Sequence, residues 1–158
     1  MRVIKIIEET MADGPGLRTS VYAAGCLHKC RGCHNPESWN FNQGNAWHPE
    51  NLAQYLIKNP YTDITFTGGD PIYQIKDLLE CCKYIKAHSN KNIWVYTGFT
   101  LEAILSQPSL KELLYYIDTI VTDPYIEDLR DTTLQFRGSS NQRITNTKDI
   151  LTIENGKN

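Results

Sequence analysis

Short runs of strand-forming residues alternate with helical segments along most of this chain, and this alternation constrains the fold more than any other feature. The pattern predicts strands at residues 17–24, 63–67, 92–97 and 118–122, and helices over 49–58, from about 71 onward, and within 101–116. Strands that alternate with helices form parallel β/α units with right-handed crossovers. The sequence therefore predicts an α/β fold built on a parallel sheet.

The length decides how far such a sheet can close. A chain of 158 residues corresponds to one domain. It is too short for a closed eight-fold β/α barrel, which takes about 250 residues. We therefore expect a single domain over residues 1–158, folded as an open, partial β/α barrel of parallel strands. In such folds ligands bind beyond the carboxyl ends of the strands.

Composition argues against several classes of partner. Sixteen Lys and Arg against eighteen Asp and Glu give a net charge of −2, which provides no positive field for nucleic acid. The longest apolar run, residues 113–117, is far below the roughly 20 residues that cross a bilayer. No basic segment followed by an apolar stretch opens the chain. We expect a cytoplasmic protein that binds neither membrane nor nucleic acid.

Three of the five cysteines, Cys26, Cys30 and Cys33, fall within eight positions with the spacing C-x3-C-x2-C. A disulfide framework is not expected without an export signal, and thiolates are soft metal ligands. Four interpretations remain open: unligated thiols in a turn, zinc with His28 or His34 as fourth ligand, c-type haem attachment at residues 30–34, and a 4Fe–4S cluster. Such clusters usually have four cysteine ligands, so three would leave one iron open.

The other two cysteines, Cys81 and Cys82, lie on the helical segment that begins near residue 71. One face of that segment is apolar and consists of Ile75, Leu78, Leu79, Cys82 and Ile85. The spacing predicts that Cys82 is a small core residue and that Cys81 lies beside the apolar face. Neither is expected to bind a metal. Arg18, in the first expected strand, is interpreted as a surface residue.

Glycine and polar residues directly follow each expected strand. The cysteine loop follows the first strand, Gly68-Gly69-Asp70 the second, Thr97 the third and Asp123 the fourth. Because the carboxyl ends of parallel strands meet at one edge, we expect these residues to share one face. Asp70 has two interpretations. It can accept a hydrogen bond from a ligand ammonium group, or it can stand at a helix start and stabilise the helix dipole.

Together these motifs resemble the radical S-adenosylmethionine (SAM) superfamily, in which a C-x3-C-x2-C loop and a Gly-Gly-Glu-Pro type motif follow successive strands. Here the second motif is Gly68-Gly69-Asp70-Pro71. Residues 13–18 (DGPGLR), 94–98 (WVYTG) and 137–142 (RGSSNQ) make the chain similar to activating enzymes of anaerobic ribonucleotide reductases. The resemblance covers about residues 6–144.

This resemblance implies a function. In the family, an electron from one 4Fe–4S cluster cleaves SAM to methionine and a 5′-deoxyadenosyl radical, which removes a hydrogen from a glycine of the partner enzyme. The implied partner is the large subunit of the anaerobic ribonucleotide reductase, and the implied electron donor is a flavodoxin or ferredoxin. The nearest alternative is an activase of the pyruvate formate-lyase type. A non-catalytic zinc-binding module is an alternative of a different class.

The resemblance also assigns roles to individual residues. The implied cluster ligands are Cys26, Cys30 and Cys33. SAM is implied to chelate the fourth iron. Three residues meet the methionine amino group: Gly68, Gly69 and Asp70. Three line the adenine side of the SAM pocket: Gly32, Cys33 and His34.

Two segments have no assigned role. The run from Arg137 to Gln142 either closes the active site or meets the reductase. Relatives commonly carry Asp-Gly after the fourth strand, where this chain has Asp123-Pro124. Because a proline favours an extended residue before it, we expect Asp123 to be extended and carry no role over to it.

Overall fold

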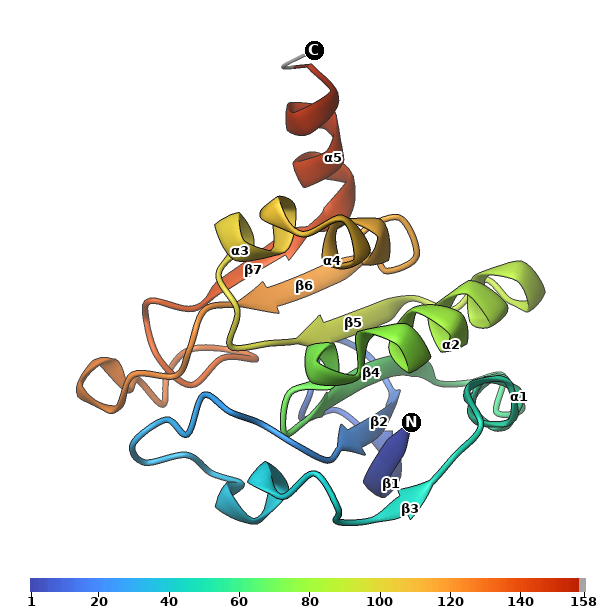
Figure 1. Cartoon of the computed structure of the whole chain (residues 1–158), viewed down its shortest axis with the longest axis horizontal. Helices are drawn as coiled ribbons and strands as arrows, with labels where there is room; N and C mark the ends of the chain where they lie inside the picture. Colours follow the sequence, from blue (N-terminus) through green and yellow to red (C-terminus); the bar gives the residue numbers. More distant parts are fainter. Residues whose placement is uncertain (157–158) are drawn as a thin grey trace.

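A seven-stranded sheet organises the computed structural model, which describes residues 1–156 (Figure 1). The strands are β1 (Arg2–Thr10), β2 (Arg18–Ala23), β3 (Asn45–Ala46), β4 (Asp63–Gly68), β5 (Ile93–Tyr96), β6 (Thr119–Thr122) and β7 (Arg143–Asn146). The α-helices are α1 (Pro49–Ile57), α2 (Ile75–His88), α3 (Leu101–Ser106), α4 (Pro108–Leu113) and α5 (Thr147–Asn155). Three short 3-10 helices complete the set: η1 (Pro36–Trp39), η2 (Pro71–Gln74) and η3 (Glu127–Leu129).

The centre of the sheet is parallel, as predicted. The strand order is β3-β1-β2-β4-β5-β6-β7, and β2, β4, β5 and β6 run parallel to one another. The four predicted strands correspond to these four. The prediction of a wholly parallel sheet is wrong at both margins, because β1, β3 and β7 are antiparallel to their neighbours. The result is a mixed, open α/β sheet.

The antiparallel margins lack the pattern of buried strands. Most of β1 and β7 is exposed or only partly buried. An antiparallel strand at or next to the edge of a sheet, packed on one face or on neither, need not carry the continuous apolar run of a central parallel strand. The helical segment 101–116 is also divided, because Pro108 begins α4 and cannot continue the hydrogen bonding of α3.

The hydrophobic core lies between the sheet and its helices. Val21, Phe66, Val95 and Ile120 come from four adjacent strands and are fully buried. Helices α2 and α4 lie across this face of the sheet in Figure 1. The predicted apolar face of α2 is confirmed in that Leu78, Cys82 and Ile85 are fully buried, and Cys81 is buried as well. Ile75 and Leu79 are partly buried and pack against the core.

The expectation that Arg18 is a surface residue is wrong, because Arg18 is only 1% exposed. Its guanidinium donates to the Ile64 carbonyl, the Thr65 hydroxyl and the Asn92 carbonyl, and it lies over the Trp94 ring. Burial lowers the pKa of Arg18. A charge can be buried where hydrogen bonds satisfy it, so Arg18 fastens β2 to β4 and β5 from within.

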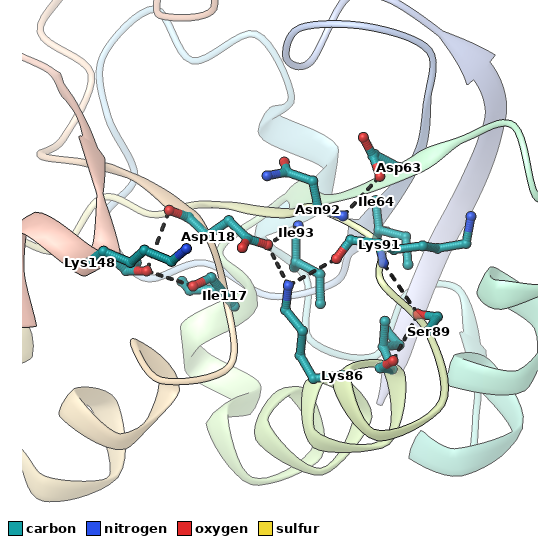
Figure 2. A network of polar contacts seen from close by, with 12 residues as sticks. Asp63, Ile64, Lys86, Ser89, Lys91, Asn92, Ile93, Ile117, Asp118 and Lys148 are labelled. Atoms are coloured by element: carbon teal, nitrogen blue, oxygen red, sulfur yellow. Dashed lines mark hydrogen bonds and ion pairs between the residues drawn. The ribbon is translucent and has the colours of Figure 1, made fainter.

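A polar network fixes the amino ends of the parallel strands (Figure 2). Asp118 Oδ2 accepts hydrogen bonds from Lys86 Nζ at 2.6 Å and from the Ile93 N–H at 2.7 Å. Asp63 Oδ1 accepts one from the Asn92 N–H at 2.8 Å. These bonds tie the starts of β4 and β5 to the residue before β6, while the carboxyl ends at the opposite edge meet the loops. No helix within residues 1–156 is long and apolar enough to cross a bilayer.

Candidate functional site

A cavity of about 220 Å³ lies at the carboxyl ends of the parallel strands. Its walls come from the cysteine loop, from the ends of β4, β5 and β6, and from the segment that precedes β7. Figure 1 shows β5 and β6 pointing toward the side from which the cysteine loop and residues 123–142 extend. Most predicted site residues line this cavity: Cys26, Cys30, Cys33, His34, Gly68, Gly69, Asp70, Thr97 and Asp123. The prediction that strand ends and cysteine loop share one face is confirmed.

The three cysteines of the loop are free thiols on the cavity wall. Cys26 is buried, whereas Cys30 and Cys33 are partly exposed. Burial raises the pKa of Cys26, and hydrogen bonds from the backbone N–H groups of His28 and Lys29 act in the opposite direction. Burial likewise raises the pKa of Cys30, against a backbone hydrogen bond from Tyr125. The Asn35 N–H donates to Cys33 Sγ at 3.4 Å.

Gly68 and Gly69 bring the end of β4 against the neighbouring main chain. A Cβ on Gly68 would lie 2.6 Å from the Ala23 nitrogen, and one on Gly69 would lie 2.6 Å from the Gly25 carbonyl oxygen. The Gly69 N–H donates to the Ala23 carbonyl at 2.8 Å, and the Asp70 N–H donates to the Gly25 carbonyl at 2.9 Å. These glycines thus let the end of β4 fit closely under the start of the cysteine loop.

Asp70 begins η2, as the second interpretation of this residue required. Its Oδ1 accepts the Ile72 N–H at 3.0 Å, which is an N-cap hydrogen bond. Its Oδ2 accepts from Thr97 Oγ1 at 2.8 Å and from the Gly98 N–H at 2.9 Å. It also lies 2.9 Å from His28 Nε2. The carboxylate is therefore a junction between β4, β5 and the cysteine loop.

His34 and Gly32 have different surroundings although one residue separates them. His34 lines the cavity, and its ring stands edge-on to Tyr125 with 5.7 Å between centroids. Gly32 is not among the residues that line the cavity. A Cβ there would lie 2.5 Å from the Glu127 carboxylate oxygen. Arg31 pairs with Glu127 at 2.7 Å, so this part of the loop is fastened to η3.

Asp123 does not have the extended backbone expected before a proline. Its φ is +79°, a left-handed value that few non-glycine residues adopt. The Asp123 N–H donates to the Phe99 carbonyl, and Gln142 Nε2 donates to the Asp123 carbonyl. Arg143 donates to both carboxylate oxygens, at 2.7 and 3.2 Å. Four tertiary hydrogen bonds therefore hold a backbone conformation that the local sequence disfavours.

Comparison with known proteins places this site in a family. A family model described as a 4Fe-4S single cluster domain matches residues 12–145. An anaerobic ribonucleoside-triphosphate reductase-activating protein of Pasteurella multocida is 34% identical over 152 residues, which cover 91% of this chain and 96% of the relative. The protein of the same name from phage T4 is 36% identical over 143 residues, covering 87% and 88%. That of Escherichia coli K12 is 32% identical over 142 residues, covering 84% and 90%.

The chain belongs to the family of anaerobic ribonucleoside-triphosphate reductase-activating proteins. Its cysteine loop lies within the part that matches the 4Fe–4S domain model. In residues 1–156 no group of three or more His, Cys, Asp or Glu side chains is arranged to hold a metal ion. The thiols instead stand around a cavity of about 220 Å³, many times the roughly 10–15 Å³ that a single water molecule needs by the same measure.

The donor set of this activating-protein chain fits an iron–sulfur cluster. All three loop cysteines are free, and backbone N–H groups are directed at each sulfur. Hydrogen bonds to the sulfurs are among the features by which a protein tunes such a cluster. Burial raises the pKa of Cys26 and Cys30, and since cysteines bind such a cluster as thiolates, its binding would release protons.

Some residues of the site were missed or left without a role by the sequence interpretation. Tyr96 and Tyr125 line the cavity, and the Tyr96 hydroxyl donates to the Phe136 carbonyl at 2.8 Å. From the 137–142 run, Arg137 and Gln142 line the cavity too. The signal available in the sequence was the position of Tyr96 at the end of an expected strand. No pattern marks Tyr125, because it reaches the site through the fold of the 123–142 segment.

Proposed function

We propose that this protein is the activating enzyme of an anaerobic ribonucleotide reductase. It holds one 4Fe–4S cluster on Cys26, Cys30 and Cys33, binds SAM beside the cluster, and generates the glycyl radical on the large subunit of the reductase. One observation carries the proposal: three free thiols of a single loop share a cavity with the ends of three parallel strands. The relatives' names supply the reaction partner.

When bound, the cluster would supply the electron that cleaves SAM. The residues of this chain position and shield the reactants. Cys26, the most buried of the three thiols, and the partly exposed Cys30 and Cys33 would hold the cluster. The backbone N–H groups around the sulfurs stabilise negative charge on the thiolates.

SAM is assigned to the part of the cavity between the cysteine loop and the strand ends. Gly68 and Gly69 offer main chain at the end of β4 to the methionine amino group, while Cys33 and His34 line the adenine side. Gly32 supports the same wall from behind, where it meets Glu127. The role proposed for Asp70 is to hold these elements together, because its carboxylate already receives several hydrogen bonds from the protein.

The remaining assignments follow from this function. The open sheet forms a partial barrel around both cofactors, and residues 1–158 act as one radical SAM domain. A flavodoxin or ferredoxin supplies the electron. A low-potential cluster with an open iron needs a reducing compartment, so we place the reaction in the cytoplasm.

The test is activation of the reductase under anaerobic conditions. The reconstituted protein, a reductant, SAM and the large reductase subunit are combined, and the organic radical on the reductase is measured by electron paramagnetic resonance (EPR). Wild type and Cys81→Ala are expected to give the radical, and Cys30→Ser is expected to give none. If the radical appears on a pyruvate formate-lyase type enzyme but not on the reductase, the alternative activase is correct. A colourless protein that binds only zinc would contradict both.

A further inference from the structure

His28 lies in the middle of the cysteine loop, between two proposed cluster ligands, and faces the sheet. Its side chain is 19% exposed, and its Nε2 is 2.9 Å from Asp70 Oδ2. Because Asp70 Oδ2 also accepts from Thr97 Oγ1 and from the Gly98 N–H, the geometry suits an imidazole whose Nε2 donates to this oxygen. The imidazole also packs against Phe99 and Tyr73, with centroid distances of 4.9 and 5.5 Å. The ring is therefore held by one hydrogen bond and by aromatic contacts on the strand side.

The bond partner of His28 is itself fixed. The Asp70 side chain is 1% exposed and accepts hydrogen bonds from the Ile72 N–H, from Thr97 Oγ1 and from the Gly98 N–H. Oδ2 accepts three of these four bonds, from His28, Thr97 and Gly98, whereas Oδ1 accepts only the Ile72 N–H. Since one carboxylate oxygen has about two acceptor sites, Oδ2 is fully occupied by the protein. The arrangement suits a rigid anchor to which the cysteine loop is attached.

Gly98 gives an independent sign that the ring belongs at this position. A Cβ on Gly98 would lie 2.6 Å from His28 Cδ2, closer than side-chain atoms approach one another. The imidazole thus lies directly on the main chain after β5, where only glycine leaves room for it. The Gly98 N–H donates to the same Asp70 oxygen as the imidazole. Ring, glycine and carboxylate form one packed unit.

We propose that His28 is a positioning residue, which clamps the cysteine loop onto the ends of β4 and β5 through Asp70. The clamp fixes Cys26 and Cys30 relative to the strand ends and so sets where the cluster stands in the cavity. The effect of the clamp on the position of the cluster rests on the proposed function. The clamp itself is a property of the protein without cofactors. It also assigns Asp70 Oδ2 to the attachment of the loop.

The first test uses the cluster-free protein, so that it does not depend on the proposed function. Hydrogen–deuterium exchange of residues 26–33 is followed by mass spectrometry, with residues 75–88 of α2 as the reference for global unfolding. His28→Ala should accelerate exchange of the loop by about ten- to a hundred-fold, as expected for the loss of a hydrogen bond to a charged group. The reference segment should be unaffected. His88→Ala, at the exposed end of α2, is the matched control and should leave the exchange of residues 26–33 unchanged.

Two further substitutions separate the hydrogen bond from simple filling of space. His28→Gln keeps an N–H donor that can reach Asp70, and His28→Leu keeps bulk without a donor. The proposal predicts that Gln restores most of the protection of the loop and that Leu does not. Equal rescue by Leu and Gln would overturn it, as would a loop that exchanges equally fast in wild type and His28→Ala.

A second measurement connects the clamp to the cofactor. In the reconstituted protein, His28→Ala should lose iron to a chelator about ten-fold faster than wild type or His88→Ala, and it should change the EPR spectrum of the reduced cluster. A spectrum and an iron-loss rate that match wild type would refute the positioning role. If wild type binds no cluster at all, the proposed function fails, whereas the exchange experiment still decides on the clamp.

Discussion

Replacing Cys81 and Cys82 together tests which thiols bind the cluster. Both residues are fully buried in the core on α2, far along the chain from the cysteine loop. Burial raises the pKa of Cys81 to about 12 and holds that of Cys82 well above its ordinary value. A thiol that stays protonated in apolar surroundings is a poor metal ligand. The Cys81→Ala, Cys82→Ala double variant should therefore keep the full iron and sulfide content of wild type.

The double substitution should lower the stability of the fold, because it removes packed atoms from the core. Two small side-chain truncations in the core are expected to lower the free energy of unfolding by about 1–2 kcal/mol in total. For a chain of 158 residues this corresponds to a drop in Tm of roughly 2–8 °C. Thermal unfolding of the cluster-free variant, followed by circular dichroism, measures this shift.

The pH dependence of stability gives a second readout of the same substitution. Because the pKa of Cys81 in the folded protein lies above its ordinary value of 9.0, its contribution to stability is complete below about pH 9. That contribution is lost as the pH rises toward 12, by up to about 1.4 kcal/mol per pH unit. The double variant should therefore lose stability less steeply than wild type above pH 9.

The iron content of the double variant decides the ligand question. If the Cys81→Ala, Cys82→Ala protein stays folded but loses its iron, one of these cysteines is a ligand, and the open fourth iron is refuted.

Three other outcomes are expected. Asp123→Asn should lower the free energy of unfolding by only about 0.5–1 kcal/mol, because Asn tolerates a positive φ and the partner Arg143 is 44% exposed. Asp123→Val should lower the free energy of unfolding by about 1–2 kcal/mol more than Asp123→Asn does. Equal shifts in Tm for the two variants would show that the backbone at this position is not strained. Arg137 lines the cavity, which favours the interpretation that the 137–142 run closes the active site; Arg137→Glu should therefore weaken SAM binding by about ten-fold in equilibrium dialysis, and unchanged affinity would favour a contact with the reductase instead. Air should bleach the cluster within a day, and a stable absorption band near 400 nm would indicate a fourth protein ligand.

The central fold was predictable because its signals are local. The buried runs of β2, β4, β5 and β6 and the helical spacing of Leu78, Cys82 and Ile85 each follow from a few consecutive residues. The common edge of the site follows from parallel topology, which places the ends of these strands together. The sequence alone therefore predicts that the cysteine loop, Asp70 and Thr97 share one face.

The errors arise where distant residues decide the outcome. Arg18 looks like a surface residue until Ile64 and Asn92, more than forty positions away, provide acceptors for its buried guanidinium. Asp123 precedes a proline, yet bonds from Arg143 and Gln142 impose a positive φ. The strands β1, β3 and β7 pair in an antiparallel manner, which largely exposed strands do not indicate in the sequence.

The role of His28 could not be read from spacing either. In the sequence it is a possible zinc ligand between two cysteines. In the structure its ring faces Asp70, and the glycine that makes room for it lies seventy positions later. A loop residue of this kind is assigned only when the strand end opposite it is known.

The most direct test of the account is SAM cleavage by the reduced, reconstituted protein in the absence of the reductase. We predict equal amounts of methionine and 5′-deoxyadenosine from wild type, quantified by chromatography after anaerobic incubation. Replacing any one of Cys26, Cys30 or Cys33 by Ser should abolish both products, and the Cys81→Ala, Cys82→Ala variant should keep them. A wild-type protein that carries a full cluster yet leaves SAM intact would contradict the central claim.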